Sequence, residues 1–273
     1  MMKTSHMRDQ EVLSRQYKDS SNLDIRKNFH KKYSTNPTSF TDWILSKIKF
    51  INGCRVLEVG CGTGSLWQNY PQLTDTFAEL VLTDISKGMI DIAKETYVAR
   101  KNIRIQAMDV LDMPFEDHSF DIIVANSMLY HVNDVDSALE IIHRILRDGG
   151  VFYATTFGKD GQISYINHAM FEMGLSDSKE IGEISFSLEN GFDLLRKHFS
   201  VVKEETYDAH LEVSEPLDLV EYIFSMSSMS HVARSNRDKM NAYFESKKDS
   251  QGILNIPVMS GMFISTKDCS LRS

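Results

Sequence analysis

Cysteine is scarce in this sequence, and its scarcity limits what the protein can be. The 273 residues include three cysteines, Cys54, Cys61 and Cys269. Their odd number and their spacing fit neither a disulfide framework nor a zinc site. Cys54 and Cys61 flank an apolar segment, which favours a packing role for both. We expect no metal centre and a reduced, cytoplasmic compartment.

Long apolar runs and an excess of basic charge are also missing. No apolar run approaches the roughly 20 residues of a membrane span, and the N-terminal MMKTSHMRDQ lacks the apolar core of a signal peptide. Acidic residues outnumber basic ones, 38 to 30, for a formal net charge of -8. Because Lys and Arg must neutralise phosphates in nucleic-acid binding, we expect no such partner. The 42% of hydrophobic residues indicates an ordinary globular protein.

Strand-like and helix-like segments alternate from residue 55 onward. Apolar runs and periodicity predict strands at 55–59, 80–85, 103–108, 120–125 and 151–157, with helices at 64–70, 89–99 and 135–146 between them. Gly149 and Gly150 are expected to end the last of these helices. This alternation is typical of an α/β fold with a parallel sheet covered on both faces.

The glycine-rich segment RVLEVGCGTG, residues 55–64, is the sharpest motif. Gly60, Gly62 and Gly64 follow an expected strand and lead into an expected helix, and glycine lets the backbone turn tightly and approach a ligand. Free amides at a helix start favour a carboxylate or a phosphate. A plain tight turn is the structural alternative, and dinucleotide-binding folds use similar loops. A strand, the glycine loop, a helix and then an acidic residue follow one another in the sequence. This order favours ligand binding over a plain tight turn.

Three acidic residues stand at the ends of the expected strands. Glu58, just before the first glycine, is placed to face a cationic ligand. Asp84 ends the second strand, where its two oxygens suit both hydroxyls of a ribose. Asp109 closes the third strand and suits an adenine amino group. Met89 and Met108 either sandwich the adenine ring or pack in the core.

Five segments occur in an order that resembles a known family. They read LEVGCGTG, TDIS with GM, MDVLDMPF, FDIIVANSMLYHV and ILRDGG. As a set they resemble the class I S-adenosylmethionine-dependent methyltransferases, in particular the small-molecule subgroup that includes ubiquinone and menaquinone biosynthesis enzymes. The resemblance implies S-adenosylmethionine as cofactor, S-adenosylhomocysteine as product and methyl transfer to a small-molecule acceptor. It also implies a Rossmann-like, doubly wound sheet of seven strands.

The resemblance assigns cofactor contacts to particular positions. The glycine loop, Cys61 included, would face the methionine end of the cofactor, and Asp84 would hold the ribose. Ile85, Asp109 and Val110 would contact adenine, and Asn126 would touch the backbone or sulfonium region of the cofactor. Tyr17 would reach over the site from the N-terminal segment.

Methyl transfer is an in-line displacement, so much of the rate comes from positioning. A general base is needed only where the acceptor is protonated. His131 follows the fourth strand at the carboxyl edge of the sheet, and its ordinary pKa of about 6.5 suits a base. Tyr130 is a further candidate, and a packing role is the alternative for His131. The segment Asn126–Leu129 lacks the Pro-Pro-aromatic sequence of enzymes that methylate adenine or protein amides, which disfavours that chemistry.

The flanks of the motif region suggest a lid and a cap. Residues 1–40 predict an N-terminal helical lid, ahead of a methyltransferase domain at 41–273. Strands expected at 201–207 and 259–266 form an antiparallel hairpin, interrupted by an insertion at 208–257 with two amphipathic helices. A long insertion in a compact domain is rarely idle, so we expect a helical cap over an apolar acceptor pocket. Packing on the flank of the sheet or a dimer interface is the alternative, and the oligomeric state stays open.

Two other functions share parts of this pattern. A nicotinamide-dependent oxidoreductase also has the glycine loop and the ribose acid, but Asp109 and the DGG turn favour the methyl donor. A non-catalytic protein that binds S-adenosylmethionine has the same site without the chemistry. If the chain is an oxidoreductase, a nicotinamide cofactor should stabilise the protein in place of S-adenosylmethionine. If it is a non-catalytic binding protein, S-adenosylmethionine should bind without giving a product.

Overall fold

The computed structural model describes residues 20–229 and 231–268, which divide into two compact units. The sheet unit comprises residues 40–156, 185–206 and 261–268. The helical unit comprises residues 20–39, 157–184, 207–229 and 231–260. None of the helices in these ranges is long and apolar enough to cross a membrane.

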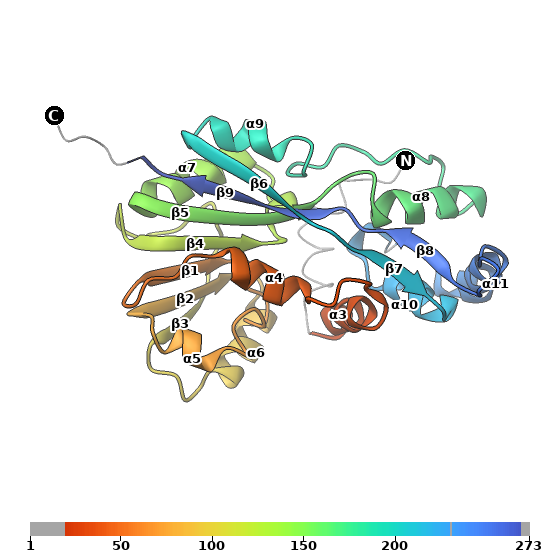
Figure 1. The fold of residues 1–273 in the computed structure, drawn as a ribbon, viewed down its shortest axis with the longest axis horizontal. Helices are drawn as coiled ribbons and strands as arrows, with labels where there is room; N and C mark the ends of the chain where they lie inside the picture. Colours follow the sequence, from red (N-terminus) through yellow and green to blue (C-terminus); the bar gives the residue numbers. More distant parts are fainter. Residues whose placement is uncertain (1–19, 230, 269–273) are drawn as a thin grey trace. The chain divides into compact units, whose positions relative to one another are not determined.

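The sheet unit is built on a seven-stranded sheet with the order β3-β2-β1-β4-β5-β9-β6 (Figure 1). The strands are β1 (Arg55–Val59), β2 (Glu79–Asp84), β3 (Ile103–Ala107), β4 (Phe120–Asn126), β5 (Leu146–Phe157), β6 (Val201–Tyr207) and β9 (Ser260–Thr266). Strands β1 to β5 pair in parallel. The predicted α/β, Rossmann-like sheet of seven strands is confirmed.

Strand β9 runs against its two neighbours. At its end, the backbone of Lys267 exchanges hydrogen bonds with Gly149 and Gly150, near the start of β5. At its start, a Cβ on Gly261 would lie 2.7 Å from the carbonyl oxygen of Glu205, near the end of β6. The last two strands of the sheet are therefore antiparallel neighbours, as the sequence predicts.

Both faces of the sheet are buried at its central strand β1. Leu57 and Val59 of β1 pack into a core with the apolar stripe of helix α7 (Val135–Ile145). Val56, which points to the opposite face, is also 0% exposed. Fully buried residues on both sides of a strand require cover on both faces, the arrangement of a doubly wound α/β fold. The other helices of this unit are α4 (Phe40–Lys47), α5 (Pro71–Thr74), α6 (Lys87–Thr96) and α9 (Gly191–Arg196).

Two details of the predicted elements are wrong. Residues 64–70 do not form a helix: the amides of Gly64, Trp67 and Tyr70 each bond to the carbonyl three residues earlier, which gives successive tight turns. The indole of Trp67 is tied into the core, which holds these turns, and α5 begins only after them. Helix α7 ends at Ile145, and Gly149 and Gly150 lie within β5 instead of ending the helix.

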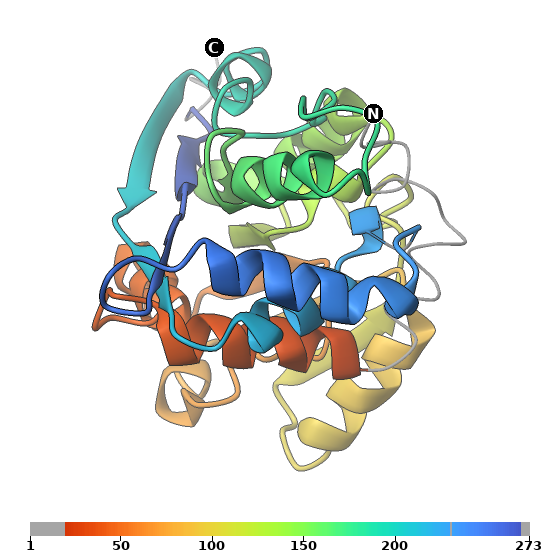
Figure 2. The same cartoon turned by 90° about the vertical axis from the view of Figure 1, so that its right-hand side faces the viewer.

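The helical unit contains four helices and a small antiparallel sheet. The helices are α3 (Ser21–Tyr33), α8 (Gln162–Glu172), α10 (Pro216–Phe224) and α11 (Arg237–Ser246), and the strands are β7 (His210–Val213) and β8 (Leu254–Pro257). Helix α10 packs against both α3, which is red in Figure 2, and α11, which is dark blue there. The sequence predicts helices in the insertion but not the β7–β8 pair, which joins the two ends of that insertion.

The helical unit has an apolar core of its own. Phe29 of α3, Met170 of α8 and Ile223 of α10 are among its buried members. Met229 and Met240, which lie in the insertion expected to cap an acceptor pocket, are 2% and 0% exposed and belong to this core. Their first role is therefore to hold the unit together, and the closing of a site by lid and cap stays a prediction.

Candidate cofactor and active site

The predicted site residues follow strands that end at one edge of the sheet. In register, Val59 at the end of β1 lies opposite Thr83 of β2 on one side and Ala125 of β4 on the other. Asp84 is the last residue of β2, and the loops after β1 and β4 carry the glycine motif and the segment that contains His131. Strand β1 is flanked by β2 and β4, so the strand order reverses here, and open α/β sheets bind ligands at such points.

The glycine loop adopts backbone conformations that other residues avoid. The φ angles of Gly60, Gly62 and Gly64 are 65°, 56° and 74°. A Cβ on Gly60 would lie 2.7 Å from Met128, and a Cβ on Gly64 would lie 2.7 Å from the ring of Tyr97. The loop is therefore closed to larger side chains by its φ angles and by its neighbours.

Asp84 connects β2 to the glycine loop. Its Oδ2 accepts a hydrogen bond from the amide of Gly62 at 2.8 Å, and its Oδ1 accepts one from the amide of Ser86 at 2.8 Å. Burial raises the pKa of Asp84, and the two amide hydrogen bonds oppose that rise. A carboxylate offers about four acceptor positions, so each oxygen retains capacity for a ribose hydroxyl.

Glu58 lies under the same loop. Its side chain is 1% exposed, and its Oε2 accepts a hydrogen bond from the indole Nε1 of Trp67 at 2.7 Å. Its backbone carbonyl accepts a hydrogen bond from the Thr83 hydroxyl at 3.2 Å. The carboxylate is thus held in place at the end of β1, and its predicted contact with a cationic ligand stays a prediction.

The thiol of Cys61 is buried within the loop. Its Sγ donates to the carbonyl of Gly62 at 3.4 Å. Burial raises the pKa of Cys61 well above its ordinary value, and the negative charges of Glu58 and Asp84 raise it further. The side chain therefore stays a protonated thiol, which agrees with the packing role expected from the sequence.

The residues expected around adenine differ in burial. Ile85 is 52% exposed directly after Asp84, which leaves an apolar side chain open to a ligand. Val110 is buried, and Asp109 is half-buried with its Oδ1 accepting a hydrogen bond from the amide of Leu111 at 3.0 Å. Met89, on α6, is 1% exposed, and its burial favours core packing over a ring sandwich. Met108 is half-buried.

A network of hydroxyl groups surrounds the end of β4. Oδ1 of Asn126 accepts a hydrogen bond from the Thr155 hydroxyl at 2.7 Å, and the same hydroxyl accepts one from the amide of Ser127 at 2.9 Å. Ser127 has a φ of 55°, in the left-handed region. Such strain costs on the order of 1–3 kcal/mol in a non-glycine residue and is concentrated at functional sites.

His131 and Tyr130 follow in a 3-10 turn, Leu129–His131. Both side chains are half-buried, and their ring centroids lie 4.5 Å apart. The carbonyl of Tyr130 accepts a hydrogen bond from the hydroxyl of Ser185 at 3.1 Å, which fixes the turn. His131 therefore lies after β4 as predicted, and its role as a base stays a prediction. Tyr17 lies outside the described residues.

The sequence pattern does not predict three side chains that hold this edge. Trp67 binds Glu58, Thr155 binds Asn126, and the hydroxyl of Tyr97 donates to the carbonyl of Gly64 at 2.6 Å. The two aromatic residues read as ordinary core residues, and nothing in the sequence pairs Thr155 with a residue so far away along the chain. Spatial neighbourhood alone identifies them.

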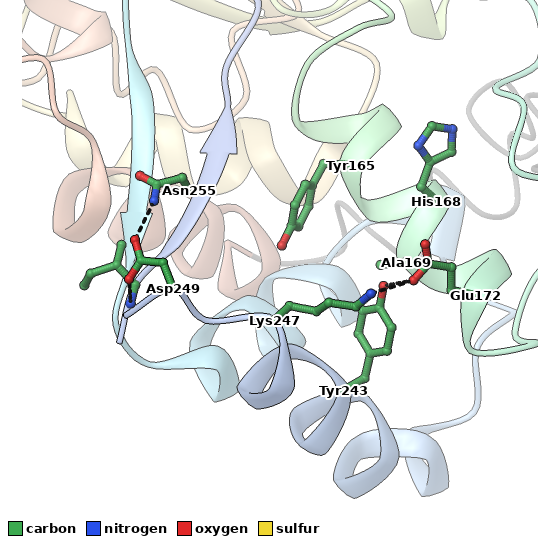
Figure 3. A pocket seen from close by; sticks show the side chains of 9 residues that line it. Tyr165, His168, Ala169, Glu172, Tyr243, Lys247, Asp249 and Asn255 are labelled. Carbon is green, nitrogen blue, oxygen red and sulfur yellow. Dashed lines mark hydrogen bonds and ion pairs between the residues drawn. The ribbon is translucent and has the colours of Figure 1, made fainter. Parts of the chain in front are cut away.

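A separate pocket of about 380 Å³ lies within the helical unit (Figure 3). Its lining residues are Tyr165, His168, Ala169, Glu172, Tyr243, Lys247, Asp249, Ile253 and Asn255. Glu172 accepts a hydrogen bond from the Tyr243 hydroxyl at 2.6 Å and pairs with Lys247 at 2.9 Å. The Glu172 carboxylate therefore has both of these partners within the pocket. None of the residues that line the pocket belongs to the predicted site.

The sequence of the sheet unit matches a known domain. Residues 57–154 match the family profile of a methyltransferase domain. Mouse mitochondrial arginine-hydroxylase NDUFAF5 is 35% identical over 104 residues, which cover 38% of this chain and 29% of that protein. The demethylmenaquinone methyltransferase of Staphylococcus aureus is 29% identical over 135 residues, which cover 46% of this chain and 56% of that protein. The match thus covers about half of these relatives or less.

Solved structures agree with this match at the level of the fold. The phosphoethanolamine N-methyltransferase 2 of Haemonchus contortus, solved with S-adenosylhomocysteine, superposes with a TM-score of 0.60 at 21% identity. The superposition covers 96% of this chain and 60% of that chain. Residues 57–154 thus form a methyltransferase domain, and the chain is similar to the class I S-adenosylmethionine-dependent methyltransferases in sequence and in fold.

The cofactor of this class is S-adenosylmethionine, and the residues at the edge of the sheet fit it. The buried Asp84 carboxylate suits a ribose diol, and the glycine loop permits a close approach of the backbone. The exposed Ile85 offers an apolar contact to a purine ring. A carboxylate-rich site suits a cationic sulfonium better than a phosphate-bearing dinucleotide, which disfavours the oxidoreductase alternative.

Proposed function

We propose that the protein binds S-adenosylmethionine at this edge of the sheet and transfers the methyl group to a small-molecule acceptor. The observation that carries the proposal is the hydrogen bond between the Asp84 carboxylate and the Gly62 amide. This hydrogen bond holds a carboxylate beside the glycine loop, within the segment that matches a methyltransferase domain, and so supports a ribose contact at this position.

The proposed roles follow the positions of the side chains. The glycine loop receives the methionine end of the cofactor, and Asp84 accepts hydrogen bonds from the ribose hydroxyls. Ile85, Asp109 and Val110 contact adenine. Asn126, oriented by Thr155 at 2.7 Å, touches the cofactor near the sulfonium.

The bound cofactor supplies a methyl group on a cationic sulfur. The chain itself has to hold donor and acceptor in line and exclude water, which is enough for a large rate gain. Where the acceptor carries a proton, we assign its removal to His131, which follows β4. Tyr130, in ring contact with His131, orients the imidazole.

Two observations bear on the acceptor. The sequence after β4, Asn126-Ser127-Met128-Leu129, lacks the Pro-Pro-aromatic pattern of enzymes that methylate adenine or protein amides. NDUFAF5 is named an arginine hydroxylase, so a relative with the same domain performs a different reaction. Methyl transfer to a small molecule therefore has two alternatives, modification of a protein and binding of the cofactor without catalysis.

Calorimetry and a product assay separate these functions. The purified chain is titrated with S-adenosylmethionine and, in parallel, with NAD. It is then incubated with S-adenosylmethionine and either the low-molecular-mass or the protein fraction of a cell extract, and S-adenosylhomocysteine is measured. We expect donor binding, no NAD binding, and product only with the low-molecular-mass fraction.

Each other outcome contradicts a definite part of the proposal. Product with the protein fraction alone identifies a protein acceptor, and binding without any product identifies a sensor. Binding of NAD in place of the donor disproves the cofactor assignment. The Asp84→Ala variant serves as the negative control, because it removes the proposed ribose acceptor.

A further inference from the structure

A small polar cluster lies inside the apolar core of the helical unit. The hydroxyl of Tyr222 in α10 donates a hydrogen bond to Oε1 of Gln162, the first residue of α8, at 3.3 Å. The ring centroid of His30, in α3, lies 5.7 Å from that of Tyr222, with the rings edge to face. Three helices far apart in the sequence thus bring together an amide, a phenol and an imidazole.

In the part of the chain that the structure describes, only one of the two polar atoms of the Gln162 amide, the oxygen, has a hydrogen-bond partner. The side chain is 8% exposed, and Nε2 has no hydrogen-bond partner among the described residues. A buried donor without a partner costs about 1–3 kcal/mol, and folded proteins contain few of them. Rotating the amide by 180° would leave the Tyr222 hydroxyl proton without its acceptor. The cluster therefore presents one spare hydrogen-bond donor.

The backbone at the start of α8 is closely packed, so it cannot shift to bring a hydrogen-bond partner to the Gln162 amide. The amide of Gly158 donates to the carbonyl of Met259 at 2.9 Å. A Cβ on Gly161 would lie 2.8 Å from the backbone nitrogen of Met259, so the two backbone segments are in close contact. Gln162 follows directly, and its side chain is fixed beside Tyr222.

The groups around the spare donor are neutral, apart from one arginine. Burial lowers the pKa of His30 to about 4, with the charge of Arg26 as the second cause, and burial raises the pKa of Tyr222 to about 12. The guanidinium of Arg26 donates to the carbonyl of Ser225 at 2.7 Å. A neutral oxygen suits this environment better than a carboxylate, whose charge is costly to bury.

The same face of α8 continues with apolar residues after Gln162. Ile166 and Met170 follow Gln162 at spacings of four residues, and both are 0% exposed. The ring of Phe29 lies 4.7 Å from that of Tyr222. We propose that this cluster binds the carbonyl oxygen of a small, largely apolar ligand, with the Gln162 amide as hydrogen-bond donor.

Methionine methyl resonances of the 273-residue chain report on this cluster, with Met170 as the nearest probe on α8. The chain is labelled with ¹³C-methyl methionine and titrated with acetophenone, toluene and benzoate. Acetophenone carries a neutral carbonyl, toluene lacks the oxygen, and benzoate carries the charge. We expect acetophenone to shift the Met170 resonance and to bind about tenfold more tightly than toluene or benzoate, the effect of one buried hydrogen bond. Equal affinities, tighter binding of benzoate, or an unmoved Met170 resonance would overturn the proposal.

A pair of substitutions tests the donor itself. Gln162→Met removes the amide at nearly constant length, and Gln251→Met makes the same change at an exposed position of the same unit. We expect Gln162→Met to reduce acetophenone affinity to that of toluene, and Gln251→Met to leave it unchanged. Unchanged acetophenone binding in Gln162→Met disproves the role of the amide. Titration of each variant with S-adenosylmethionine tests the proposed function separately, because the cofactor residues belong to the sheet unit.

Discussion

The carboxylate of Asp84 holds the glycine loop through the backbone amide of Gly62, at 2.8 Å. The second oxygen of the same carboxylate receives the amide of Ser86, whose hydroxyl in turn caps helix α6 by accepting the amide of Met89. One acidic residue therefore organises the loop after β1 and the helix after β2. A change at this position alters the shape of the site as well as its hydrogen-bonding capacity.

Asp84→Ala should weaken the binding of S-adenosylmethionine by about 1.5–3 kcal/mol, the range for hydrogen bonds to a charged group. Asp84→Asn keeps one acceptor oxygen, so its loss should be smaller. Asp112→Ala is the matched control, because Asp112 is an exposed acid in a nearby loop. Calorimetric affinities equal to the wild type in Asp84→Ala would remove Asp84 from the cofactor site.

Gly60→Ala and Gly53→Ala form a pair that separates backbone strain from steric exclusion. Both glycines have positive φ angles, 65° and 78°, so each alanine costs about 1–2 kcal/mol in backbone strain. Only at Gly60 would the new Cβ meet a neighbour, Met128 at 2.7 Å, whereas nothing lies within 4 Å at Gly53. We expect both variants to lose stability in urea unfolding and only Gly60→Ala to lose donor affinity. A similar loss of affinity in both would show that the loop is not a contact surface.

The buried pair of Trp67 and Glu58 should show a strong energetic coupling. Trp67→Phe removes the donor to the Glu58 carboxylate and leaves a buried charge short of one hydrogen bond, so it should cost about 1.5–3 kcal/mol. In the background of Glu58→Leu, the same change should cost less, because the carboxylate is gone. A double-mutant cycle by urea unfolding measures the difference. Additive effects would mean that the hydrogen bond contributes nothing to stability.

The sequence predicts the sheet well because its information is local. Buried parallel strands appear as continuous apolar runs, and β1 begins and ends where the pattern indicates. The error at residues 64–70 has a long-range cause, since the hydrogen bond of Trp67 to Glu58 holds a turn where helical periodicity is weak. The left-handed φ of Ser127 likewise depends on Thr155, a contact between β4 and β5 that no local pattern encodes.

In the helical unit, too, local patterns predict single helices but not which segments pack together. The amphipathic stretches at 217–226 and 237–247 are confirmed as α10 and α11. The sequence cannot show that segment 157–184 joins them in one unit, because the segments are far apart along the chain. The buried Met229 and Met240 illustrate the ambiguity of methionine, which suits a ligand pocket and a core equally well.

His131→Ala distinguishes a general base from a packing residue. If His131 removes a proton from the acceptor, turnover should fall by about 10²–10⁴ while donor affinity stays near that of the wild type. His168→Ala, at an exposed position of the helical unit, is the control. Normal turnover with a lower melting temperature in His131→Ala would establish packing as its role.

His30 should make the stability of the protein depend on pH between about 6.5 and about 4. The unfolded chain binds a proton on this histidine below its ordinary pKa of 6.5, whereas burial beside Tyr222 and the charge of Arg26 lower the folded-state pKa to about 4. Between these values the unfolded state holds more protons, so acidification lowers the free energy of unfolding, by up to about 3 kcal/mol at pH 4. Above pH 6.5 the histidine is neutral in both states and contributes no pH dependence. His30→Asn should remove this part of the loss, and His168→Asn, at an exposed position of the same unit, should not. Urea unfolding followed by circular dichroism at pH 7, 5.5 and 4 measures the effect, and equal pH dependence in the His30→Asn variant and the wild type would contradict it.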